Sequence, residues 1–264
     1  MAANQLAQTV RQQLGIGRVL PLGGPEDGAW ITERAAAEVL RTAVGGLAGV
    51  RLGALRLAVA DPDSAPEPAV PPPPSALPPG PLRIEADFAA VADRPLPAVA
   101  EGLRAALLAA ADRELGLVVS TVDLRVSDLL EEGEAGGEGE AEGEGAGGGQ
   151  AGPSPAGAET GPPSAEAGPA DAPGGRTGST ASGLGGIAAT ALAVPGVARL
   201  APVLGSLSRP VRVTDGHALI QLATTAGHRT LDVAAAVRAA VTSAMPAPLT
   251  VAVLVTAVEP GRTA

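Results

Sequence analysis

Two histidines and a few serines are the side chains best suited to chemistry in this chain, which contains no Cys and no Tyr. His217 and His228 border one expected strand, but the extended chain between them would hold them about 35 Å apart. No third ligand completes a metal site around them. Four serines have no histidine and acid in the pattern that hydrolases use, namely Ser120, Ser127, Ser206 and Ser208. We therefore expect no enzyme activity, no metal and no cofactor.

Two glycine clusters and one basic region could instead bind nucleotides or nucleic acids. Gly15 to Gly17 and Gly183 to Gly186 are not followed by the strand-to-helix pattern of a phosphate loop. The C-terminal part is basic, with arginines at positions that include Arg199, Arg209, Arg212 and Arg229. No aromatic residues are interleaved with them to stack on bases. Nucleic acid is not the expected partner, although an adaptor that binds nucleic acid through this basic part stays open as the alternative.

Charge is distributed unevenly along the chain, whose net charge is -10. Residues 1–130 carry -4, residues 131–182 carry -9 and residues 183–264 carry +3. Every basic residue is Arg, as is typical of a bacterium with a GC-rich genome. The acidic segment combines repeated Glu with Gly, Ala and Pro and has little apolar surface to bury, which predicts a disordered linker over 131–182.

The segments on the two sides of this linker repeat one order of patterns. Gly49-Val50 is followed by an alternating strand, by the helical pattern RPLPAVAEGLRAAL from Arg94 and by a closing strand. After the linker, Gly196-Val197 is followed by a strand, by RTLDVAAAVRAAV from Arg229 and by another closing strand. The repeat predicts an α+β protein made of two tandem helix-strand-strand-helix-strand units. In each unit we expect a three-stranded sheet with helices packed on it.

The first unit is expected over residues 28–130, after an N-terminal segment 1–27 that contains a short amphipathic helix. Thr32 is placed to cap the first helix, and Leu82, Ile84, Ala86 and Phe88 alternate with polar residues in the clearest strand pattern of the chain. Residues 62–81 contain ten prolines and predict an extended insert at the tip of a hairpin. The second unit, over residues 183–259, has Asp215-Gly216 as a tight-turn signal between two strands.

The order of these patterns resembles the bacterial alkaline shock protein family of cell-envelope stress proteins. The residues that carry the resemblance are GAWITERAAAEVL from Gly28, RPLPAVAEGLRAALLAA from Arg94 and the strand VVSTVDLRV. Residues 28–130 follow the family pattern closely, whereas 185–258 diverge, and the proline insert and the acidic linker are foreign to it. The resemblance implies a cytoplasmic protein without enzyme activity that self-associates and acts at the inner face of the membrane through a membrane-anchored partner.

An interaction protein needs an exposed face, and the polar side of the best strand supplies one. Arg83, Glu85 and Asp87 alternate with the apolar residues of that strand, and Arg212 follows in the second unit. These four residues are the candidate interaction residues.

Two segments raise the question of membrane contact. Residues 177–198 are uncharged but rich in Gly, Ser, Thr and Ala, so we expect no membrane insertion. The N-terminal residues lack a signal-peptide core, which favours a cytoplasmic location, at most peripheral to the membrane.

Overall fold

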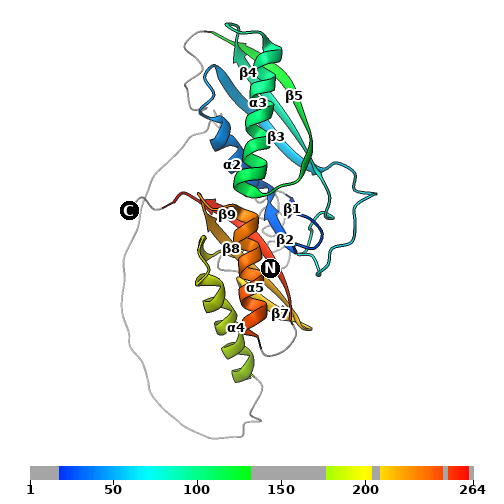
Figure 1. Cartoon of the computed structure of the whole chain (residues 1–264), viewed down its shortest axis with the longest axis vertical. Coiled ribbons are helices and arrows are strands. Elements are labelled where there is room, and N and C mark those ends of the chain that lie inside the picture. Colours follow the sequence, from blue (N-terminus) through cyan, green and yellow to red (C-terminus); the bar gives the residue numbers. More distant parts are fainter. Residues whose placement is uncertain (1–17, 132–176, 204–208, 246–248, 262–264) are drawn as a thin grey trace, which may run out of the picture.

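The computed structural model describes residues 18–131, 177–203, 209–245 and 249–261. These residues form an α+β structure with a six-stranded sheet, here called sheet A, and a three-stranded sheet, here called sheet B. Four α-helices pack on the sheets. The two sheets follow one another along the long axis of the molecule, with α3 lying across sheet B and with α4 and α5 lying on sheet A (Figure 1).

Sheet B has the strand order β3-β4-β5. β3 (Val50–Val59) pairs antiparallel with β4 (Leu82–Val91), and β4 pairs parallel with β5 (Val119–Leu130). The expected alternation in β4 is confirmed, because Leu82, Ile84 and Phe88 are buried while Arg83 and Glu85 are exposed. The apolar side faces α3 (Leu96–Ala110), whose Leu103 and Leu107 are fully buried. A π-helical turn, Ala111–Leu115, and Gly116 in the left-handed region connect α3 to β5.

α2 (Glu33–Val44) begins where the sequence predicts it. The Thr32 Oγ1 accepts a hydrogen bond from the Ala35 N–H at 3.3 Å, as a helix N-cap does. Ala36 and Leu40 lie on the buried side of the helix. Glu33, in the first turn, accepts hydrogen bonds from the backbone N–H groups of Arg18 and Leu57, and so joins the segment before sheet A to β3 of sheet B.

Sheet A has more strands than the three expected for the second unit. β8 (His217–Thr225) pairs antiparallel with both β6 (Val197–Leu200) and β7 (Val211–Thr214), and parallel with β9 (Thr250–Glu259). The three additional strands are β6, which precedes β7 in the second unit, and β1 (Val19–Leu22) and β2 (Ala29–Thr32), two short strands from the N-terminal part of the chain. β2 pairs parallel with β9 and antiparallel with β1. Every residue of both strands is buried. The segment before α2 is therefore part of sheet A and not an exposed connection.

α4 (Thr177–Leu192) and α5 (Thr230–Ala244) cover one face of sheet A. The first six residues of α4, 177–182, belong to the segment that was expected to be linker. Residues 132–176 of the predicted linker lie outside the described residues, and so do residues 1–17 of the N-terminal segment in which a short amphipathic helix is expected. The turn between β7 and β8 is the tight turn expected, since Asp215 and Gly216 both have positive φ.

The proline-rich insert connects β3 to β4, as expected, and it also docks onto sheet A. The Leu77 N–H donates to the Val19 O at 2.8 Å, and the Ala69 N–H donates to the Pro25 O at 3.0 Å. Val70 is buried in a small apolar cluster with Trp30 and Leu254. The insert therefore shields the outer edge of β1 and one end of sheet A.

A single large apolar cluster extends through both sheets. It contains Ile84 and Leu103 on the side of sheet B, and Ile220 and Val237 on the side of sheet A. Polar contacts also cross the junction: the Arg229 Nη2 lies 3.2 Å from the Asp112 Oδ1, and its Nε donates to the Asp112 O. The two sheets thus share one core.

Candidate interaction surface

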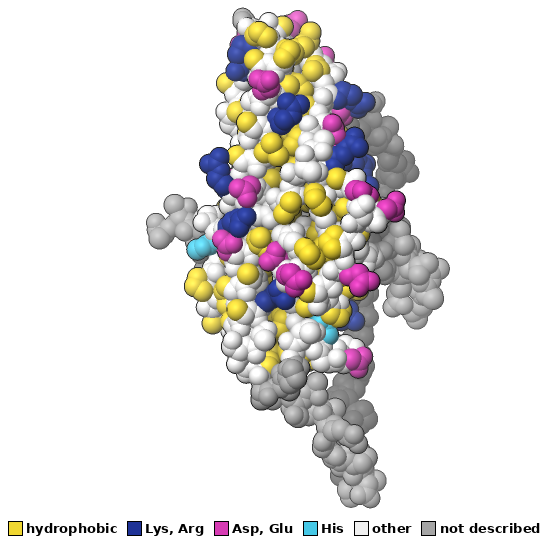
Figure 2. All heavy atoms as spheres, turned by 45° about the vertical axis from the view of Figure 1, so that its right-hand side comes forward, with side chains coloured by type: hydrophobic (Ala, Val, Ile, Leu, Met, Phe, Trp, Pro, Cys, Tyr) yellow, Lys and Arg dark blue, Asp and Glu magenta, His cyan; other side chains and the backbone are white. Residues whose placement is uncertain are grey.

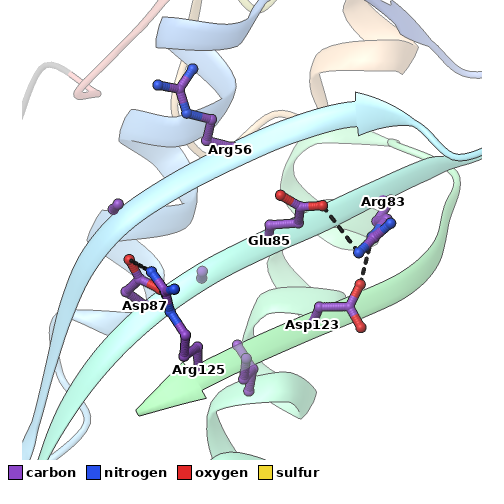
Figure 3. Close-up of a pocket in the computed structure, with 9 residues that line it drawn as sticks. Arg56, Arg83, Glu85, Asp87, Asp123 and Arg125 are labelled. Carbon is purple, nitrogen blue, oxygen red and sulfur yellow. Dashed lines mark hydrogen bonds and ion pairs between the residues drawn. The ribbon is translucent and has the colours of Figure 1, made fainter. Parts of the chain in front are cut away.

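The polar side of sheet B is its open side. Because side chains alternate across a strand, the burial of Ile84 and Phe88 against the helices turns Arg83, Glu85 and Asp87 to the opposite face. The structure therefore brings three of the four candidate residues together in one row on β4. Figure 3 shows this row on a curved sheet, with the neighbouring strands supplying further charged side chains.

Two arginines tie the row to β5. The Arg83 Nε lies 2.6 Å from the Asp123 Oδ2, and its second ion pair joins Nη2 to the Glu85 Oε1 at 3.1 Å. The Arg125 Nε and Nη2 donate to the two Asp87 carboxylate oxygens at 2.8 and 3.1 Å. Parallel pairing of β4 with β5 places Asp87 directly opposite Arg125. Asp123 aligns with Glu85, so the Arg83 side chain reaches it diagonally.

The bidentate pair alters the ionisation of both partners. Hydrogen bonds from the Arg125 guanidinium lower the pKa of Asp87 below the ordinary value of 3.8, against the opposing effect of desolvation. The same hydrogen bonds and the attraction of the carboxylate raise the pKa of Arg125. Both groups are therefore charged at neutral pH, and the surface presents fixed charges of both signs.

A shallow hollow of about 420 Å³ lies over this row. Its floor is formed by charged residues of all three strands of sheet B, which are Arg56, Arg83, Glu85, Asp87, Asp123 and Arg125. The three positive and three negative side chains balance one another. Arg56 makes no ion pair or hydrogen bond with the described residues and points from β3 beside the hollow (Figure 3). The hollow can hold a charged or polar segment of another protein, but it offers no nucleophile and no paired acid and base.

Arg212 lies elsewhere. It is on β7, opposite Leu219 of β8, at the sheet A end of the molecule. The structure thus separates it from the row on β4, and the two positions do not form one surface.

Two of the residues considered for other chemistry, His217 and Ser120, make hydrogen bonds within the fold. The His217 Nδ1 lies 2.8 Å from the Thr250 Oγ1, and partial burial lowers the pKa of this histidine, which favours its neutral form. His228 follows the other end of β8. Among residues 18–131, 177–203, 209–245 and 249–261, no group of three or more His, Cys, Asp or Glu is placed to hold a metal. The Ser120 Oγ donates to the Leu82 O, and Gly183 to Gly186 lie within α4 rather than in a loop.

The basic residues of the C-terminal part are partly neutralised. Arg199 pairs with Glu259 at 2.6 Å, and Arg229 pairs with Asp112 and Asp232. On the face drawn in Figure 2, positive and negative side chains are interspersed rather than gathered into a basic stripe. That face shows no continuous positive groove of the kind that tracks a nucleic-acid backbone. No helix among the described residues has the length and apolar character needed to cross a membrane.

The sequence pattern of β4 identifies only three of the six charged residues of this surface. The other three, Arg56 on β3 and Asp123 and Arg125 on β5, also alternate with apolar residues in the sequence. The sequence of one strand does not show which strand lies beside it, so these residues could not be assigned to the same surface. Ser206, Ser208 and Gly15 to Gly17 lie outside the described residues. Comparisons of the chain with protein-family models, with curated proteins and with solved structures found no match.

Proposed function

We propose that this chain is an interaction protein without enzyme activity, of the cell-envelope stress type, which self-associates and binds a membrane-anchored partner from the cytoplasmic side. The observation that carries the proposal is the open face of sheet B, where six charged side chains of balanced sign line a wide, shallow hollow. Complementary charges of this kind favour selective association with another protein surface and fix its orientation. The resemblance to the alkaline shock protein family supplies the biological setting of the proposal.

We further propose that the two halves arose by duplication of one unit. The support is topological: β4 and β8 each pair antiparallel with preceding strands and parallel with the strand that follows the next helix. Gly49 and Gly196, which directly precede β3 and β6, both have positive φ. The polar face then belongs to the first unit, because the corresponding face of sheet A carries buried Ala252 and Leu254.

The experiment compares two variants of equal charge change in a strain that lacks the native gene. In the first, the row is reversed by Arg83→Glu, Glu85→Arg and Asp87→Arg. In the control, an exposed residue of α2 is reversed by Glu38→Arg, which changes the net charge by two units in the same direction as the row variant. We expect the row variant to lose tolerance of envelope stress and to lower the membrane-associated share of the protein about tenfold, equivalent to about 1.4 kcal/mol of binding free energy.

The control variant and a His217→Ala/His228→Ala variant should keep both properties, provided that circular dichroism shows all three proteins folded. The opposite pattern, with activity lost in the histidine variant and retained in the row variant, would show that the protein acts through a chemical site instead.

A further inference from the structure

The edge of sheet B formed by β5 has no further strand paired with it among the described residues. β5 is the last strand in the order β3-β4-β5, and within the described parts of the chain no strand pairs with its outer side. Register shifts near its two ends leave a regular stretch in which Thr121 aligns with Arg83 and Val126 aligns with Phe88. This stretch offers an uninterrupted template for one more strand.

The backbone groups available on this edge can be identified. The Leu82 N–H donates to the Val118 O, so Leu82 and every second residue after it on β4 direct their backbone groups toward β5. Ile84 is one of these, and in a parallel pair its aligned partner Val122 directs its groups away from β4. The Arg104 Nε reaches the Val122 O at 3.4 Å, which agrees with an outward carbonyl. By the same alternation Leu124 and Val126 also face outward.

The corresponding edge of sheet A already carries an added strand. β9 occupies the same place beside β8 as β5 does beside β4, and β2 pairs with its outer side. The Val253 N–H donates to the Gly28 O at 3.0 Å in this contact. An edge of this construction therefore accepts a strand within the same molecule.

We propose that β5 pairs antiparallel with β5 of a second copy of this chain, about a two-fold axis at Leu124. This proposal rests on the self-association in the proposed function and names the surface responsible for it. In this register Leu124 faces Leu124 of the second copy, and Val122 faces Val126, so that the three outward residues of each strand exchange backbone hydrogen bonds. The Arg104 side chain moves aside from the Val122 O when the strands meet.

The side chains are self-complementary in the same register. Asp123 lies opposite Arg125 of the second copy, and Arg125 lies opposite Asp123, in the pairs whose side chains approach most closely. On the other face, Val126 is 41% exposed in the single chain and would be covered by Val122 of the second copy. The result is a continuous six-stranded sheet in which the two charged faces join.

The test uses four full-length variants and measures oligomeric state by sedimentation. Asp123→Arg places two positive charges opposite each other across the axis, and Arg125→Asp places two negative charges there. Each single variant should dissociate at least about tenfold more readily than the wild type. A mixture of the two variants restores both opposite-charge pairs, so an equimolar mixture should form a heterodimer.

Arg51→Asp is the matched control, because Arg51 is exposed on β3, the other edge strand of the same sheet. It should dimerise like the wild type. Leu124→Pro, which removes an outward N–H while leaving the pairing with β4 intact, should be a folded monomer.

Each other outcome overturns the proposal. If the wild type stays monomeric, the β5 edge does not bind a second copy and only a strand from a different protein could pair with it. The same result would also contradict the self-association in the proposed function. A dimer that persists in all the variants would locate self-association on another surface and leave the proposed function standing. Single variants that dissociate without rescue on mixing would show that Asp123 and Arg125 act within their own chain only.

Discussion

Individual side chains at the start of α2 hold the two sheets together. The Thr32 Oγ1 accepts from the Ala35 N–H and also lies 3.3 Å from the Thr256 O of β9. Thr32 is 1% exposed, so no water replaces these contacts. Glu33, the next residue, bonds to the backbone on both sides of the junction. Loss of either side chain would leave buried backbone groups without partners, which costs more than the hydrogen bonds contribute when they are formed.

Thr32→Ala should therefore lower the free energy of unfolding by about 1 to 2 kcal/mol, the upper range for loss of an N-cap. Chemical denaturation followed by circular dichroism measures the change. Thr42→Ala is the control, because Thr42 is exposed and its hydroxyl only donates to the Glu38 O within α2. Equal effects of the two substitutions would contradict the role assigned to the cap.

Gly28, just before β2, is a position where a side chain does not fit. Its φ is 53°, and a Cβ at this position would lie 2.7 Å from Val70 and 2.9 Å from Arg238. Arg238 binds the carbonyl oxygens of Glu26, Asp27 and Val251 there. A residue with a side chain would both strain the backbone and displace these contacts.

Among the elements, the proline-rich insert has the role least expected from its composition. A proline-rich segment of this length could extend into solvent without any contact. Instead its backbone bonds to Val19 and Pro25, and its Val70 is 6% exposed in the cluster that contains Trp30. The insert thus acts as a strap from sheet B across the end of sheet A.

Val70→Ala should lower the free energy of unfolding by roughly 1.5 kcal/mol, since each buried methyl or methylene group contributes about 0.8 kcal/mol. Trp30 is the only Trp in the chain and is 2% exposed, so its fluorescence reports on this contact. We expect its emission to shift to longer wavelength in Val70→Ala. Val213→Ala, at a site 38% exposed on β7, should change neither stability nor emission. An unchanged spectrum in Val70→Ala would show that the insert does not protect Trp30.

In the whole molecule, the two halves of the sequence are not two separate folding units. β2, from the N-terminal part of the chain, pairs with β9 near the C-terminus, and the main apolar cluster includes residues of both sheets. Units of this size with cores rich in Ala and Val bury little apolar surface and are marginally stable alone. The shared core compensates for that deficit.

Residues 1–131 and 177–264 produced as two separate chains should therefore bind each other. Each fragment alone should lack a cooperative unfolding transition, and mixing should restore one. Ile31→Asp in the first fragment should abolish association, because Ile31 is fully buried and pairs with Val255 of β9. Val118→Asp, at a site 49% exposed, should leave the association of the fragments unchanged. A second fragment that unfolds cooperatively without the first would contradict this view.

Local features of the fold were predictable from the sequence by itself. The alternation in β4, the Thr32 cap and the Asp215-Gly216 turn each depend on residues within a few positions of one another, so that pattern and backbone preference determine them. The row of Arg83, Glu85 and Asp87 was predictable for the same reason.

Only the tertiary structure decided which edges and faces meet. Thr32 and Thr256 are more than two hundred residues apart, and the pairing of β2 with β9 depends on which edge of sheet A is free. The ion pairs of Arg83 with Asp123 and of Arg125 with Asp87 exist because β5 returns parallel to β4 in one register. A sequence carries the donors and acceptors of every strand, but the choice among edges is made by the burial of apolar surface over the whole chain.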